Sequence, residues 1–151
     1  MEFLKHDIIV WRKELVKTCR KRKAWSVERF ASVWVEILSK HKRLLELLSI
    51  LHSFLEKNVS EQSLVDFKRR AIDELKVLSE LLCKMFPALS PEKAGEFLEL
   101  QLAAAIGLYQ ITNLSEMQQR VLEYPEFRNL KVDFNSYSQK TVECLLQGLM
   151  A

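Results

Sequence analysis

The stretch HKRLLELLSILHSFLEKNVSEQSLVDFKR, from His41 to Arg69, repeats leucine and phenylalanine at spacings of three and four residues. This spacing is the period of an α-helix that buries one face. The apolar face is wide, as in a helix surrounded by neighbours, and it consists of Leu44, Leu47, Leu48, Leu51, Phe54 and Leu55. We therefore predict a helix from about Ser39 to about Asn58 and a second one after it.

The start of that second helix has two candidate caps. Asn58 and Glu61 match a capping box, in which each side chain reaches the other residue's backbone N–H, and Ser60 is the alternative N-cap. The helix is predicted to run to about Phe86, where Pro87 ends it. Its apolar stripe consists of Leu64, Phe67, Ala71, Leu75, Leu78, Leu82 and Met85.

Upstream, a first helix is predicted from about Glu2 to about Cys19. Ser26 is the predicted N-cap of the next helix, and Glu28 in its first turn suits the positive end of the helix dipole. The basic run KTCRKRKAWS, Lys17 to Ser26, lies between these two helices. Such a run suits either a phosphate-binding element or a solvated helix end, and its position at a helix C-terminus favours the latter.

Downstream, Ser90, Pro91 and Glu92 form a strong helix start. The helix that follows, about 90–114, is apolar on two faces, because Phe97, Leu98, Gln101, Ala105 and Leu108 make one and Leu100, Ala103, Gly107 and Leu114 make another. A helix of this kind is covered from two sides. We expect one side to meet the domain's own core and the other a second subunit.

The last helix is predicted from about Asp133 to 150, after a connection that holds Pro125 and a second possible capping box, Asn113 to Glu116. One face carries Phe134, Tyr137, Thr141, Leu145 and Leu149, with further apolar residues beside it. Like the preceding long helix, it is more apolar than one core contact requires.

The composition agrees with an all-helical chain. Only 3 glycines and 3 prolines occur in 151 residues, which is too few for the turns of a sheet protein. We predict one all-α domain over residues 1–151, a helical bundle of about six helices. The net charge of +3 is too small and too dispersed for autonomous DNA binding.

No motif of a known chemistry is present. The sequence lacks a nucleophile elbow, a phosphate-binding glycine loop and a zinc-protease motif. Cys19, Cys83 and Cys144 are far apart, and His41 and His52 have no third ligand at metal spacing. We therefore expect no enzyme activity, no cofactor, no metal and no membrane segment, and a cytoplasmic protein with reduced cysteines.

Gln101 is the polar residue that needs an explanation. It lies on an apolar face of the helix that is covered twice, where an unpaired amide is costly to bury. Either it makes a hydrogen bond within the core, or it orients a ligand.

The same residues carry a family resemblance. The leucine-rich helix ending in LEKN, the VS turn and the following FK resemble the C-terminal regulatory domain of the tetracycline-repressor (TetR) family of bacterial transcription regulators. The stretches LQLAAAIGLYQITN, 100–113, and FNSYSQKTVECLLQGLM, 134–150, are similar to the last two long helices of that domain. The resemblance covers about residues 1–150.

Family members begin with a helix-turn-helix domain whose pattern ends near YxYFxxKExL, and this chain has no such pattern. The first helix looks like the remainder of the helix that joins the two domains. We therefore expect the ligand-binding and dimerisation half of a repressor-type regulator, without its DNA-binding domain and without direct nucleic-acid binding. The missing domain is either a deliberate truncation or a natural feature of a short relative.

The resemblance implies a homodimer and a pocket for a small, largely apolar effector. The dimer would use the helices at about 90–114 and 133–150, with the interface residues Leu100, Ala103, Gly107, Leu114, Phe134, Tyr137, Thr141, Leu145 and Leu149. The candidates to face the pocket are Trp11, Leu15, Trp34, Leu38, Phe67, Ala71, Gln101 and Ala105. The alternative is a helical interaction module without a ligand that heterodimerises with a full-length regulator.

Overall fold

A computed structural model describes residues 1–151, and every element in it is helical. The elements are α1 (Glu2–Cys19), α2 (Val27–Lys40), α3 (Lys42–Ser49), the π-helical turn η1 (Leu51–Leu55), the 3₁₀ turn η2 (Glu56–Asn58), α4 (Glu61–Met85), α5 (Pro91–Thr112), α6 (Glu116–Val121), the 3₁₀ turn η3 (Pro125–Leu130) and α7 (Phe134–Met150). The all-α prediction is confirmed, but the helices outnumber the six expected.

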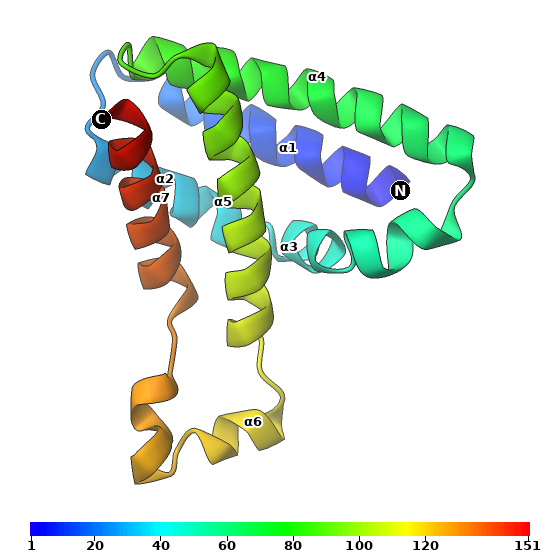
Figure 1. The fold of residues 1–151 in the computed structure, drawn as a ribbon, viewed down its shortest axis with the longest axis vertical. Coiled ribbons are helices and arrows are strands. Elements are labelled where there is room, and N and C mark those ends of the chain that lie inside the picture. The colour runs from blue at the N-terminus through cyan, green and yellow to red at the C-terminus, as the bar shows by residue number, and fades with distance from the viewer.

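The body of the molecule is a bundle of α1 to α5 and α7 (Figure 1). The first helix lies beside α4, and α5 and α7 pack together across the ends of these two. Helix α2 packs against α7, while α3 packs against α1 and α5. Residues 114–132 project from the body as a separate lobe, which we call the arm.

Serine caps fix three of the long helices where the sequence predicted them. The side chains of Ser26, Ser60 and Ser90 each accept a hydrogen bond from the backbone N–H three residues on. Of the two candidates before α4, the structure uses Ser60, since the Asn58 amide instead donates to the Phe54 carbonyl. Helix α1 runs from Glu2 to Cys19, as predicted.

The prediction of one continuous helix at 39–58 is wrong. The backbone leaves helical geometry at His41, and the chain then continues as α3, η1 and η2. The His41 imidazole lies 2.8 Å from a Glu14 carboxylate oxygen and so holds this corner against α1. The turn lets Leu44, Leu45 and Leu48 become buried against neighbouring helices, while Phe54 stays 59% exposed. Tertiary packing has overridden the continuous helical pattern.

The capping box predicted at Asn113–Glu116 is also displaced. Ser115 and Gln118 make it instead: the Ser115 hydroxyl accepts from the Gln118 N–H, and the Gln118 amide oxygen accepts from the Ser115 N–H. This box begins α6, which the sequence pattern had left inside a connection. A six-residue helix is too short to show an amphipathic period.

The basic run lies at the end of α1 and in the turn before α2. Arg20, Lys21, Arg22 and Lys23 are exposed, and the Trp25 ring nitrogen donates to the Cys19 carbonyl at 3.1 Å. The tryptophan next to the cations therefore satisfies a carbonyl at the end of α1.

Burial raises the pKa of the Cys19 thiol to about 11. None of the helices combines the length and the hydrophobicity that a membrane-spanning segment requires.

The hydrophobic core divides into two clusters. The larger one joins parts of α1, α2, α4, α5 and α7 around Phe30 and Phe97, both fully buried. The smaller one joins the start of α1 to α3, η1, α4 and α5 around Leu44 and Phe67. Trp11 packs against both clusters, so it marks the place where they meet.

Candidate functional site

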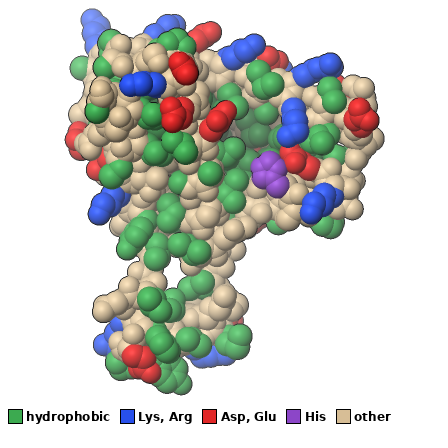
Figure 2. All heavy atoms as spheres, viewed as in Figure 1, with side chains coloured by type: hydrophobic (Ala, Val, Ile, Leu, Met, Phe, Trp, Pro, Cys, Tyr) green, Lys and Arg blue, Asp and Glu red, His purple; other side chains and the backbone are tan.

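A cavity of about 360 Å³ lies between the two core clusters. Its volume falls within the range of pockets that bind small molecules. In Figure 2 the molecule is hollowed beside α5, and hydrophobic side chains lie in the depth of the hollow. Sixteen of the 21 residues that line the cavity are hydrophobic, so a ligand there would exchange water for an apolar surface.

The lining comes from α1, α2, α3, η1, η2, α4 and α5. It consists of Ile8, Trp11, Trp34, Leu38, Leu44, Leu45, Leu48, Leu51, His52, Glu56, Phe67, Lys68, Ala71, Ile72, Glu74, Leu75, Leu78, Leu98, Gln101, Leu102 and Ala105.

Seven of the eight residues named from the sequence as pocket candidates lie on this one cavity. They are Trp11, Trp34, Leu38, Phe67, Ala71, Gln101 and Ala105. Leu15 does not, because it is fully buried in the larger core cluster, one turn further along α1. Ile8, which lies three residues before Trp11 on α1, lines the cavity.

Several lining residues were not among the sequence candidates. Leu44, Leu45, Leu48 and Leu51 follow from the bend at His41, and no periodic pattern predicts where a helix turns. The polar rim of His52, Glu56 and Lys68 was also missed. His52 and Lys68 are mostly exposed and do not belong to an apolar stripe, so only their three-dimensional neighbours place them here.

Three lining residues carry buried polar atoms without a partner in the protein. They are the ring nitrogens of Trp11 and Trp34 and both atoms of the Gln101 amide. The two indole rings meet edge to face, with their centroids 5.1 Å apart. Gln101 is only 2% exposed. Since buried polar groups are nearly always hydrogen-bonded, these atoms without partners beside a cavity call for an explanation.

The charged groups of the wall are already paired. A Glu74 oxygen accepts from the Arg12 Nε at 2.5 Å, and the other oxygen lies 3.3 Å from the Arg70 Nε. The Arg12–Glu74 contact joins α1 to α4 directly beside the cavity. An ion pair with so little exposure depends on both partners, because either charge alone would be buried without compensation.

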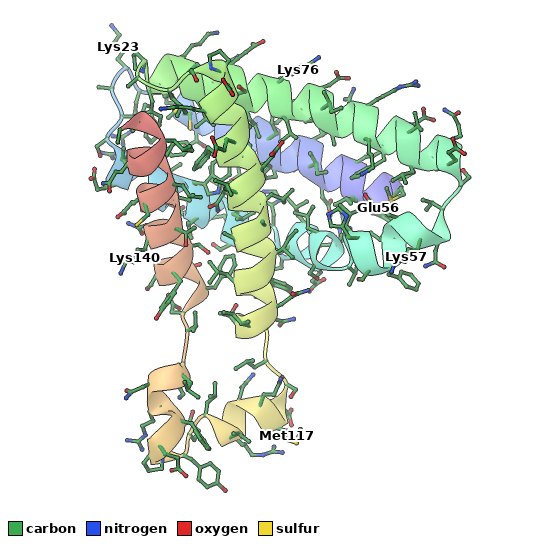
Figure 3. All side chains as sticks on the ribbon, in the orientation of Figure 1. Lys23, Glu56, Lys57, Lys76, Met117 and Lys140 are labelled. Atoms are coloured by element: carbon green, nitrogen blue, oxygen red, sulfur yellow. The ribbon has the colours of Figure 1, made fainter.

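At the rim, Glu56 contacts Lys68 and His52. Its carboxylate accepts from Lys68 Nζ at 2.9 Å, and its other oxygen lies 3.0 Å from His52 Nδ1. These hydrogen bonds, first from Lys68 and then from His52, lower the pKa of Glu56. In Figure 3 Glu56 lies between α4 and the segment of α3 and η1. The cavity therefore offers no unpaired charge to a ligand.

The residues predicted for the dimer interface lie on α5 and α7 and at the start of the arm, and none of them is buried in the chain. Leu100 is 43% and Tyr137 51% exposed, and a Cβ added at Gly107 would meet no heavy atom within 4 Å. Leu145 and Leu149 pack partly on the larger core cluster, and Phe134 on the smaller one. The other predicted residues are Ala103, Leu114 and Thr141, each at least partly exposed.

The fold and the cavity define a class of all-helical domains that hold an apolar hollow of ligand size. A family model described as "Tetracyclin repressor-like, C-terminal domain" matches residues 5–151, nearly the whole chain. The chain belongs to this family of TetR-like C-terminal domains. Among curated proteins nothing matches the chain.

Proposed function

We propose that the chain is the effector-binding and dimerisation domain of a TetR-type transcription regulator. The observation that carries the proposal is the apolar cavity with the unpartnered Trp11, Trp34 and Gln101 on its wall. Family membership supports a regulatory role of this kind. The proposal includes no catalysis, because the polar groups at the cavity are paired with one another or are amide and indole groups that bind rather than react.

The proposed effector is small, largely apolar and uncharged, and it carries at least one polar group. The hydrophobic lining favours an apolar body, and the paired carboxylates leave no net charge to attract an ion. A carbonyl or hydroxyl group on the effector would accept from an indole N–H or bond to the Gln101 amide. Satisfying such groups gives specificity, because a ligand without the matching atom leaves them unpaired.

The effector would act through α1. Ile8 and Trp11 of α1 line the cavity, and Arg12 ties the same helix to Glu74 on α4. In the family resemblance this helix leads to the DNA-reading domain. If the effector binds one arrangement of α1 more tightly than another, it raises the population of that arrangement. The difference between the two affinities determines the size of the regulatory effect.

The proposed homodimer uses the outer faces of α5 and α7. The exposed Leu100 and Tyr137 and the open surface at Gly107 support it, because a helix without a side chain at that point allows a partner helix to come close.

Binding is tested with the Trp25→Phe variant, which retains only Trp11 and Trp34, the two cavity tryptophans. Titration with uncharged aromatic compounds should change their fluorescence saturably, at one compound per chain. A charged analogue of the same size should bind at least about tenfold more weakly, because a buried unpaired charge costs more than 1.4 kcal/mol. A fluorescence that stays constant across an apolar compound library would contradict effector binding.

Dimerisation is tested with Gly107→Leu, and Gly95→Leu is the matched control on the same helix. Neither new side chain meets an atom of its own chain within 4 Å at the Cβ, so both variants should fold. Light scattering should show a dimer for the parent and the control, and a monomer for Gly107→Leu. A parent that stays monomeric at all concentrations would refute the dimer, whereas a dimer that tolerates Gly107→Leu would place the interface elsewhere.

A further inference from the structure

The arm, residues 114–132, is not supported by its own chain. None of its residues is buried, and neither core cluster includes any of them. Its side-chain contacts are internal: Lys131 pairs with Glu123 at 2.6 Å, and the rings of Tyr124 and Phe127 meet edge to face at 6.4 Å. Figure 1 shows it joined to the body only through the ends of α5 and α7.

The arm is nevertheless apolar. Met117, Val121, Tyr124, Phe127 and Leu130 are between 37% and 65% exposed. Figure 2 shows hydrophobic side chains gathered on the arm, and Figure 3 places Met117 away from the helices of the body. So many exposed large apolar side chains on a short segment indicate a surface that another molecule covers.

The position of the arm between α5 and α7 indicates which molecule covers it. Nine of the fifteen large hydrophobic side chains that are exposed lie on the continuous segment of α5, the arm and α7. The arm is thus an extension of the face proposed above for self-association, and a partner on that face is the molecule nearest to it. This step rests on the proposed dimer.

Size and charge agree with a second copy as the occupant. A stable interface uses roughly 20–30 residues per side, and the arm adds its exposed apolar side chains to those of the α5–α7 face. Its charged residues are Glu116, Glu123 and Glu126 against Arg120, Arg128 and Lys131, which balance. Two identical arms can therefore meet without net repulsion, whereas a strongly charged arm would favour a partner of opposite sign.

We propose that the arm is a dimerisation element that packs against a second copy of this chain. Its apolar side chains then complete the α5–α7 interface. A chain without a partner leaves the arm exposed to solvent.

The first test compares two pairs of exposed apolar residues. Met117→Ser with Leu130→Ser removes side chains that are 65% and 63% exposed on the arm, and Phe3→Ser with Phe54→Ser removes ones that are 70% and 59% exposed elsewhere. Analytical ultracentrifugation should show the dimer dissociation constant raised about tenfold or more by the arm pair, and unchanged by the control pair. An arm variant that dimerises as tightly as the parent overturns the proposal but leaves the α5–α7 dimer standing.

The second test needs no mutation. Hydrogen exchange of the arm amides is measured in the full chain above and below the dimer dissociation constant. Amides in residues 115–131 should be protected at high concentration and exchange freely at low concentration, while those of α1 and α4 change little. If the arm amides exchange freely in a sample that is dimeric, the arm does not pack against the second copy. That result would refute the proposed role of the arm in dimerisation. A parent that never dimerises would refute the proposed dimer itself, and the arm proposal with it.

Discussion

At the scale of single residues, Gln101 connects the fold to the proposed function. Its amide is buried at the cavity without a partner in the protein, which is an arrangement that stability alone would not favour. Such a group calls for an explanation, and the one proposed here is a ligand that bonds to it. The two indole nitrogens nearby extend the same argument.

We expect Gln101→Leu to separate stability from binding. The change removes an unpaired buried amide and keeps the volume, so stability should stay the same or rise by about 1 kcal/mol. Affinity for an effector with a carbonyl or hydroxyl group should fall about tenfold, while a purely hydrocarbon analogue should bind as before. Urea unfolding and fluorescence titration measure the two effects. Gln62→Leu, at an exposed amide on α4, serves as the control and should change neither.

Asp7 and Arg43 give a pH-dependent prediction. Two hydrogen bonds from Arg43 lower the pKa of the Asp7 carboxyl below its ordinary value of 3.8, and His6 and His41 add in the same direction. Since the folded pKa is the lower one, the contribution to stability is complete above pH 3.8 and is lost as the pH falls through the folded pKa.

Asp7→Asn should therefore be less stable than the parent at pH 7, and the difference should shrink as the pH falls below 3.8. Thermal unfolding of both proteins between pH 7 and pH 2.5 measures it. A difference that stays constant over that range would mean that the charge of Asp7 contributes nothing.

At the scale of helices, the Arg12–Glu74 pair is the most direct link between α1 and α4. It lies at the cavity wall, so it is placed to transmit a shift of α1. Neither residue stands out in the sequence, because they are 62 positions apart and each lies among other charged residues.

A double-mutant cycle should show the two residues to be strongly coupled. Glu74→Leu alone leaves Arg12 unpaired in a site where it is 18% exposed, and should cost about 3 kcal/mol. The double change Arg12→Met with Glu74→Leu should restore most of this loss, because an apolar pair replaces a buried ion pair at little cost. Urea unfolding at a fixed protein concentration provides the free energies. Additive effects would show that the two side chains act independently.

How far the sequence predicts the structure is also clear at this scale. Helices with a cap and a long apolar stripe, such as α4 and α5, were predicted closely because their start signals and period are local. The turn at His41 was not, because it depends on the contact with Glu14 of α1. The arm was missed because α6 and η3 have no buried face of their own.

The cavity shows the same division. Trp11, Trp34 and Gln101 were named from the sequence as pocket candidates on the family resemblance, and all three line the cavity. Leu15 was wrongly placed with them, because residues one turn apart on a helix can belong to different layers of the core. The rim residues His52 and Lys68 meet Glu56 only in the folded chain.

At the scale of the whole molecule, the division of the core explains both the cavity and the proposed switch. Two apolar clusters that meet incompletely leave room between them, and α1 crosses from one to the other. A ligand that fills this space would join the clusters and fix the position of α1. The unoccupied α5–α7 face and the arm are then left for a second copy.

The cavity between the two clusters is the proposed effector site, and a variant that fills the cavity tests that assignment. Ala105 is 4% exposed and lies on the wall, so Ala105→Phe should occupy the space with its own ring. Ala71→Leu, from the opposite wall, is the milder second variant if the larger ring overpacks the core.

The measurement is equilibrium binding of N-phenyl-1-naphthylamine, an uncharged apolar fluorophore, to the parent and both variants, with circular dichroism to confirm that each is folded. We predict one saturable site per chain in the parent, and affinity lowered at least about tenfold in the folded variants. Binding that is absent in the parent, or unchanged in both folded variants, would show that the cavity is not an effector site.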